Sequence, residues 1–272
     1  MGIFLFLTPF TDCMLKKTET PLLDILKTIP DSFKVLDVGA AYAPTKRADV
    51  VIDIVPYDNV HWNQAKGNSK ERFSKDTYVQ HDICSRELWP FYDKQFDYSI
   101  CSHVLEDIRD PLWVCSEIIR VSKSGYIEIP SRIYEQTFGI ETKKLTGAAH
   151  HRWIIDLVDG KIRFTFKYFY VYYRVLNKMR KASKKDDLVL RIEWRDSFDY
   201  FENWLNSGKE IFEYFLERPI TQKEMWRIYR KTQRGNVIVR WLKYFKNTNA
   251  FLNALFKKLK KHENNYPSSD KK

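Results

Sequence analysis

Three aspartates stand at the ends of short apolar stretches in the first half of the chain: Asp37, Asp53 and Asp82. A carboxylate that follows a buried strand can accept hydrogen bonds from both hydroxyls of a ribose, and Asp53 is placed for this task. Asp82 can accept a hydrogen bond from an exocyclic amine such as that of adenine, while Ile83 beside it offers an apolar surface to the ring. The spacing therefore predicts a nucleoside site.

A glycine and a polar segment extend this pattern. Gly39 closes the apolar stretch that holds Asp37, and a glycine there lets the backbone turn sharply and approach a ligand. Residues 102–111 place polar groups after a further apolar stretch and then begin a helix. Pro111 falls in the first turn of that helix, where no backbone N–H is needed.

Five short apolar strands must position these residues: 33–39, 49–53, 77–82, 96–102 and 125–130. Two helices are expected as well, over 21–28 and 110–121. Crossover segments join the strands instead of tight hairpin turns, which is typical of a parallel sheet buried on both faces. The predicted fold class is α/β, with a doubly wound and mostly parallel sheet. In such a sheet, ligands bind beyond the carboxyl ends of the strands.

The pattern changes after residue 150. Asp159 and Gly160 supply the positive φ angles of a tight turn, which predicts a hairpin over 153–166. The elements expected next are a helix at 168–179, a strand at 188–194, and helices at 202–216, 221–230 (capped by Thr221), 237–245 and 249–261. We therefore divide the chain into a core (1–150), an α+β C-terminal extension (151–262) and a disordered tail (263–272).

Charge is distributed unevenly over the 272 residues, which have a formal net charge of +11. Residues 1–150 carry 18 Lys and Arg against 21 Asp and Glu, whereas residues 151–272 carry 28 against 14. Such a basic half favours an anionic partner, namely a phosphate-bearing acceptor, a lipid surface or nucleic acid, unless it serves only to keep the protein soluble. The aromatic content of 15% excludes disorder over most of the chain, and no apolar run is long enough to span a membrane.

Five motifs in this order resemble a class I S-adenosylmethionine-dependent methyltransferase: VLDVGA at 35–40, ADVVIDI at 48–54, HDI at 81–83, FDYSICSHVLEDIRDP at 96–111 and GYIEIPSR at 125–132. The resemblance implies a Rossmann-like fold and S-adenosyl-L-methionine as cofactor. The cofactor-binding residues that it implies are, from the loop through the ribose and adenine to the methionine portion, Asp37, Gly39, Ala40, Asp53, Asp82, Ile83, Ser102 and His103.

The cofactor loop departs from the family's usual pattern. The family reads DxGxGxG, whereas Ala41 and Ala43 stand here in place of the second and third glycines, and the first crossover is too short for a full helix. A change from glycine to alanine is sterically mild, and a shortened loop with a proline, here Pro44, occurs in a branch of the family. We therefore expect a site that binds the cofactor. The alternative is a degenerate, non-catalytic fold that acts as an interaction protein.

Four candidate bases follow the fifth strand: Tyr134, Glu135, His150 and His151. Methyl transfer from a sulfonium needs proximity, alignment and a group that removes the acceptor's proton. Because a histidine titrates near neutral pH, His151 is the first catalytic candidate, followed by His150 and Glu135. Glu135 has a second interpretation, a salt bridge with Arg132 or Arg152.

The sequence favours neither a metal site nor disulfides. His81, Asp82 and Glu106 lack the spacing of a ligand cluster, so no metal is expected. The four cysteines show no CxxC spacing, and three of them stand within apolar runs, which indicates reduced and buried thiols. Reduced thiols favour a cytoplasmic protein.

The acceptor is predicted from a weaker resemblance. Chains in which a GYIEIPSR-type strand precedes an HHRW segment and a hairpin look like methyltransferases of bacterial surface-glycan pathways. The hypothesis is O-methylation of a sugar, a sugar-phosphate or another small anionic acceptor in polysaccharide biosynthesis. The enzyme would be cytoplasmic, with peripheral contact to the inner face of the membrane through the basic helix 251–261. An RNA methyltransferase with 219–261 as its RNA surface is the alternative, although the fourth-strand motif of base methylation is missing.

Overall fold

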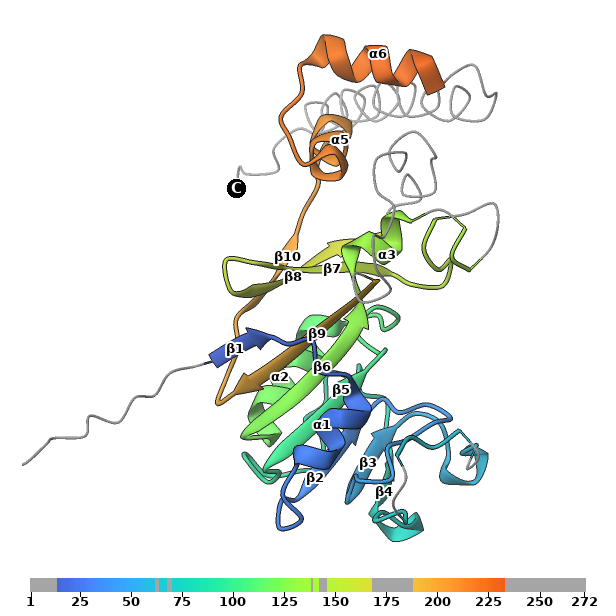
Figure 1. The fold of residues 1–272 in the computed structure, drawn as a ribbon, viewed down its shortest axis with the longest axis vertical. Coiled ribbons are helices and arrows are strands. Elements are labelled where there is room, and N and C mark those ends of the chain that lie inside the picture. Colours follow the sequence, from blue (N-terminus) through green and yellow to red (C-terminus); the bar gives the residue numbers. More distant parts are fainter. Residues whose placement is uncertain are drawn as a thin grey trace, which may run out of the picture. The chain divides into compact units, whose positions relative to one another are not determined.

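The computed structural model describes residues 14–61, 64–67, 70–137, 139–141, 146–167 and 188–232. The chain forms two compact units, Met1–Asn206 and Ser207–Lys272, and Figure 1 shows the elements of both. The first unit includes strands from both sides of residue 150. The division into core and extension at that residue stays a prediction about function.

A seven-stranded sheet is the centre of the first unit, in the order β1-β9-β6-β5-β2-β3-β4 (Figure 1). Its strands are β1 (Met14–Lys17), β2 (Val35–Val38), β3 (Val50–Asp53), β4 (Tyr78–Gln80), β5 (Tyr98–Ser102), β6 (Ser124–Pro130) and β9 (Val189–Arg195). The strands from β2 to β6 pair in parallel, and β9 runs antiparallel between β6 and β1. The predicted α/β fold with a mostly parallel sheet is confirmed.

Helices cover both faces of this sheet, because successive side chains of a strand point to opposite faces. Val35 of β2 packs in a cluster with α1 (Leu22–Thr28). Leu36 belongs to the main core, which also contains the buried residues of α2 (Pro111–Val121). α2 starts as predicted, with Pro111 in its first turn and the Asp110 side chain accepting a hydrogen bond from the backbone N–H of Trp113.

Three strands form a second, smaller sheet in the order β10-β8-β7: β7 (Trp153–Val158), β8 (Lys161–Phe166) and β10 (Tyr200–Asn203). β7 and β8 are the predicted hairpin, and both residues of its turn have positive φ, 49° for Asp159 and 74° for Gly160. The short helix α3 (Arg132–Gln136) precedes them. Two single 3-10 turns, Tyr57–Asn59 and Lys75–Thr77, lie in the connection from β3 to β4.

The predicted helix 202–216 is wrong in its first part. Residues 200–203 form β10, which pairs in parallel with β8, and the helix α5 starts at Gly208 (Gly208–Leu216). Ser207 marks the true start, because its hydroxyl accepts a hydrogen bond from the backbone N–H of Glu210. Pairing with β8 thus outweighs the helical pattern at residues 202 and 203. β1 was not predicted either.

The second unit contains α5 and α6 (Gln222–Thr232). The predicted cap of α6 is confirmed, since the backbone N–H of Glu224 donates to the Thr221 hydroxyl at 3.1 Å. The helices expected at 168–179, 237–245 and 249–261 and the tail 263–272 lie outside the described residues. None of the helices that the structure describes has the length and apolar character needed to cross a membrane.

Candidate active site

The backbone turn after β2 places the cofactor loop against the segment that follows β5. Gly39 has φ +66°, and a β-carbon added to it would lie 2.5 Å from Cγ1 of Val104. Only glycine combines this left-handed conformation with so close an approach. Ala41, which stands in place of a family glycine, has φ 50° and therefore adopts a conformation that costs an alanine energy. Ala40 lies between the two and is half-buried.

The carboxylates of Asp37 and Asp53 accept hydrogen bonds from residues of the cofactor loop. Asp37 is buried, and its Oδ2 accepts hydrogen bonds from the backbone N–H of Thr45 at 2.6 Å and from the Thr45 hydroxyl at 2.8 Å. Asp53 is also buried and accepts from the backbone N–H groups of Ala41 at 2.6 Å and Val55 at 2.7 Å. Burial raises the pKa of both carboxyl groups, although these hydrogen bonds oppose the shift.

A lysine that the sequence analysis missed covers the same edge. Lys66 exchanges backbone hydrogen bonds with Pro44 and Lys46, so its segment runs beside the cofactor loop. Its Nζ lies 3.3 Å from the hydroxyl of Ser102 at the end of β5. The ammonium group of Lys66 thereby links the cofactor loop to the end of β5. Ser102 is the residue predicted to lie beside the methionine portion of the cofactor.

The predicted adenine residues have polar partners of their own. Asp82 accepts from the backbone N–H of Cys84 at 2.9 Å and from Arg109 at 2.7 Å. Burial raises the pKa of Asp82, but these two partners outweigh it and lower that pKa overall. Ile83 is 6% exposed and packs in the main core, so it offers little surface to a ring. Cys84 is one of three buried cysteines within the described residues, all of them free, as expected.

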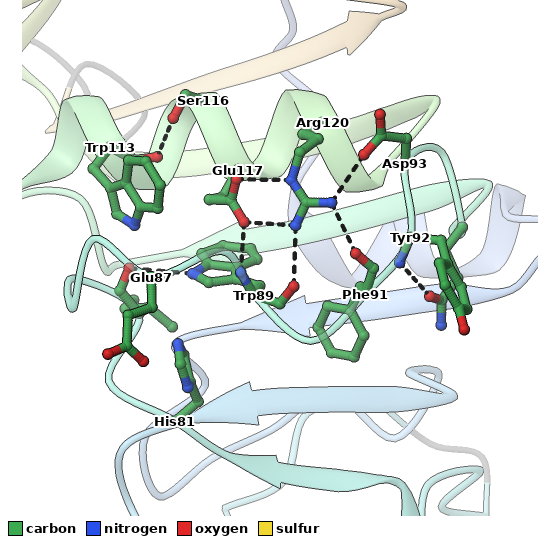
Figure 2. A network of polar contacts seen from close by, with 12 residues as sticks. His81, Glu87, Trp89, Phe91, Tyr92, Asp93, Trp113, Ser116, Glu117 and Arg120 are labelled. Carbon is green, nitrogen blue, oxygen red and sulfur yellow. Dashed lines mark hydrogen bonds and ion pairs between the residues drawn. The ribbon is translucent and has the colours of Figure 1, made fainter.

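Two residues of α2 fasten the segment between β4 and β5 (Figure 2). Glu117 accepts from the backbone N–H of Trp89 at 2.7 Å and pairs with Arg120 at 2.7 Å. Arg120 in turn donates to the carbonyl groups of Trp89 and Phe91. Because the Trp89 indole also donates to the carbonyl of Ile83 at 3.2 Å, this network fixes the backbone beside the predicted adenine residues.

His103 stands between two glutamates directly after β5. It has φ 57°, and its ring nitrogens lie 3.3 Å from Glu106 and 3.5 Å from Glu128. Burial lowers the pKa of His103, but the two carboxylates outweigh it and raise that pKa to about 9. Glu128 also accepts from Tyr126 at 2.7 Å and Arg191 at 2.9 Å. These donors and His103 overcome the effect of burial and lower the pKa of Glu128 to about 2.

The predicted catalytic residues form a second network. Nδ1 of His151 lies 2.5 Å from Oε1 of Glu135, and the other oxygen of Glu135 is bound by the buried ammonium group of Lys167. The partners seen for Glu135 are thus His151 and Lys167, and Arg132, one of its two suggested partners, pairs with Asp156 at 3.2 Å. His150 is exposed and lies 3.3 Å from Glu141.

Two backbone hydrogen bonds join the network around His103 to the network around His151. The N–H groups of Arg152 and Trp153 donate to the carbonyl oxygen of Glu106, at 2.6 and 3.1 Å. The segment that carries His151 is therefore attached to the segment that follows β5 and carries His103. Nε2 of His151 lies 3.9 Å from Oδ1 of Asp107 in that segment. The sequence-predicted histidines thus lie at one edge of the sheet.

Part of the first unit matches a known protein family. Residues 38–127, about a third of the chain, match the family model described as a methyltransferase domain. Residues 38–127 form a methyltransferase domain. A domain of this kind implies an S-adenosylmethionine-dependent methyltransferase, with S-adenosylmethionine as the cofactor. No curated protein matches the chain.

Several solved structures are similar to parts of the chain. The PH0226 protein of Pyrococcus horikoshii OT3 is 16% identical with a TM-score of 0.36, over 63% of this chain and 85% of that one. An S-adenosylmethionine-dependent methyltransferase of Mesorhizobium loti is 12% identical with a TM-score of 0.35, over 63% and 95%. The [4+2]-cyclase SpnF is 17% identical with a TM-score of 0.30, over 41% of this chain and 45% of the cyclase. Likenesses this weak carry no argument about the reaction.

The residues at the edge fit S-adenosylmethionine. The turn at Gly39 leaves no side chain on the loop at its approach to Val104, and Asp53 has a carboxylate at the end of β3. A carboxylate offers about four acceptor sites, so Asp53 can hold its two backbone N–H groups and still bind ribose hydroxyls. The ammonium group of Lys66 suits the cofactor's carboxylate.

Proposed function

We propose that the methyltransferase transfers the methyl group of S-adenosylmethionine to an oxygen atom of a small anionic acceptor, such as a sugar or sugar-phosphate of polysaccharide biosynthesis. The observation that carries this proposal is the attachment of the His151 segment to the carbonyl oxygen of Glu106. Since Glu106 follows β5, the attachment supports a role for the His151 segment near the position proposed for the transferred methyl group.

Each residue has a stated task in this proposal. The bound cofactor supplies an electrophilic methyl group. Gly39, Asp53 and Lys66 hold and orient the cofactor. Glu135 accepts the Nδ1 proton of His151, which leaves Nε2 of that ring to face the acceptor. Burial lowers the pKa of His151, but Glu135 outweighs it and raises that pKa, so the ring is a stronger base than free histidine.

The anionic acceptor is proposed from the charge of the chain. Residues 151–272 carry the whole positive excess and contain the elements that follow the methyltransferase domain. A phosphate-bearing acceptor would give this excess a purpose, either directly or through peripheral contact of 251–261 with an anionic membrane. A cytoplasmic location with access to the inner face of the membrane belongs to the same proposal.

The cofactor half is tested by calorimetric titration of S-adenosylmethionine into wild-type protein and Asp53→Ala. Loss of the ribose hydrogen bonds should weaken binding by about 1–3 kcal/mol. Asp58→Ala, an exposed carboxylate on the first 3-10 turn, is the matched control and should bind like wild type. Unchanged affinity of Asp53→Ala would refute its role, and no binding by wild type would leave a non-catalytic interaction protein.

The acceptor half is tested by incubating a glycan and metabolite pool with isotopically labelled cofactor. Mass spectrometry should find the label in a sugar or sugar-phosphate, and His151→Ala should lower that labelling while cofactor affinity stays close to wild type. Label in RNA, together with salt-sensitive retention of RNA on a filter, would favour the RNA methyltransferase instead.

A further inference from the structure

Three side chains from two segments converge at the outer end of the acceptor network. Asp107 belongs to the segment after β5, and His150 and His151 precede β7. One carboxylate oxygen and one ring nitrogen from each histidine lie within 4.8 Å of one another. The sequence analysis expected no metal because it considered His81, Asp82 and Glu106, and nothing in the spacing relates Asp107 to the two histidines some forty residues later.

Each of the two histidines has a carboxylate at the same ring nitrogen. Nδ1 of His151 lies 2.5 Å from Glu135, and Nδ1 of His150 lies 3.3 Å from Glu141. A histidine that binds a metal usually donates the N–H of its other nitrogen to a carboxylate or carbonyl, which fixes the tautomer and turns the ring. Both histidines are therefore arranged to offer Nε2 as a ligand atom.

The third side chain supplies the missing negative charge. Oδ1 of Asp107 is buried, accepts no hydrogen bond from any residue that the structure describes, and lies 3.9 Å from Nε2 of His151. A buried carboxylate oxygen without a donor is costly, so buried polar atoms of this kind call for an explanation. A cation between Asp107 and the two Nε2 atoms would satisfy it.

We propose that Asp107, His150 and His151 bind one divalent transition-metal ion such as Zn²⁺, with Glu135 and Glu141 as the carboxylates that orient the histidines. Two imidazoles and one carboxylate are a known donor set for such ions, and they leave a position open. Ligands around a tetrahedral ion at about 2.1 Å stand about 3.4 Å apart. The three side chains must therefore close slightly, and His150 is free to do so because its side chain is 62% exposed.

The ion would also resolve an electrostatic conflict, a step that rests on the proposed function. At the acceptor edge, Glu128 and Glu135 are paired with Arg191 and Lys167, whereas the Asp107 carboxylate has no Lys or Arg partner among the described residues and repels an anionic acceptor. An ion with an open position binds an oxygen of such an acceptor and lowers the pKa of a bound hydroxyl. In this ion-bound form, Nε2 of His151 is a ligand, and the hydroxyl proton passes to solvent.

Calorimetric titration of Zn²⁺ into the chelator-treated full chain tests the site. Wild type should bind one ion per chain, and Asp107→Asn and His150→Ala should each bind at least about 10-fold more weakly. His61→Ala is the matched control, because His61 stacks on Tyr42 outside the cluster, and it should bind like wild type. No saturable binding at millimolar Zn²⁺, or equal affinity in all four proteins, would overturn the proposal.

Co²⁺ absorption reports on the ion's ligands, and thermal unfolding reports on whether the variants fold. Co²⁺ in place of Zn²⁺ should give a visible absorption band in wild type that Asp107→Asn and His150→Ala lose, and a band that survives both changes overturns the proposal. Thermal unfolding monitored by circular dichroism confirms that the variants fold. S-adenosylmethionine titration of the same samples separates the two ideas, since cofactor binding without ion binding refutes only the ion site, and ion binding without cofactor binding refutes only the proposed function.

Discussion

Two carboxylates of the cofactor half and two of the acceptor half are held by different kinds of partner. In the cofactor half, Asp37 and Asp53 accept hydrogen bonds from backbone N–H groups of the loop that they support. In the acceptor half, Glu128 and Glu135 pair with ionisable side chains, and Oδ1 of Asp107 has no donor among the described residues. Backbone partners make a rigid support, whereas side-chain partners make a site whose charge and protonation can change.

Glu135→Ala should have the largest effect, because it acts on a buried ion pair of the acceptor half. It removes the carboxylate partner of Lys167, whose side chain is fully buried. Breaking a buried pair costs about 3–5 kcal/mol, and the free energy of unfolding should fall by that amount. Urea denaturation measures it. Glu141→Ala removes the exposed pair with His150, and the free energy of unfolding should fall far less because solvent screens that pair. Equal losses would show that burial does not distinguish the two pairs.

Gly39→Ala tests the rigidity of the cofactor half. The added β-carbon would overlap Val104 in a left-handed conformation, so the free energy of unfolding should fall by about 2–4 kcal/mol. Gly160→Ala has φ +74° but no atom within 4 Å, so it should lose only about 1 kcal/mol. Thermal or urea unfolding separates them. In a double-mutant cycle, adding Val104→Ala to Gly39→Ala should cost less free energy of unfolding than Val104→Ala alone, because the smaller side chain relieves the overlap. Additive losses in the double mutant would contradict the overlap.

The pH dependence of stability tests the side-chain partners of His103. Its pKa in the folded protein is about 9, above the value of about 6.5 for an unfolded chain. The pairs with Glu106 and Glu128 therefore contribute their full stability below about pH 6.5 and lose it as the pH rises through about 9. The urea midpoint should fall with pH more steeply in wild type than in His103→Asn. Parallel slopes would remove His103 as the cause.

Ala41→Gly should give the smallest effect, with the opposite sign. Ala41 has φ 50°, which glycine adopts without strain, so the change should stabilise the protein by about 0.5–1 kcal/mol. Ala43→Gly is the control, because Ala43 is not among the residues with positive φ and should lose stability instead. Urea denaturation measures both variants. A gain in stability in both would show that the effect does not come from the positive φ angle of Ala41.

The same difference between the halves explains what sequence could predict. Asp37 and Asp53 stand at the ends of apolar runs and accept hydrogen bonds from backbone N–H groups within about a dozen residues of themselves. The local sequence pattern was therefore enough to predict their positions. The turn at Asp159 and Gly160 was equally local. Glu128 and Arg191 are 63 residues apart, and Lys66 and Ser102 are 36 apart. Such pairs depend on the order of strands in the sheet, which no local spacing encodes.

Two short strands were missed for a related reason. β1 is four residues long and ends in two lysines, and β10 is four residues long within a helical pattern. Neither has the apolar run that predicts a strand, and both form only because a longer strand offers them its edge, β9 for β1 and β8 for β10. Tertiary pairing therefore decided these elements against local preference.

The place of β9 between β6 and β1 has a consequence for synthesis on the ribosome. β6 ends at Pro130 and its antiparallel neighbour begins at Val189, so about 60 residues must be translated before the edge of β6 is covered. At about 5–20 residues per second, that takes about 3–12 s. During this interval β6 has an open edge and β1 has no partner, which exposes the nascent chain to aggregation. Translation of β9 ends this interval and attaches the start of the chain to the sheet.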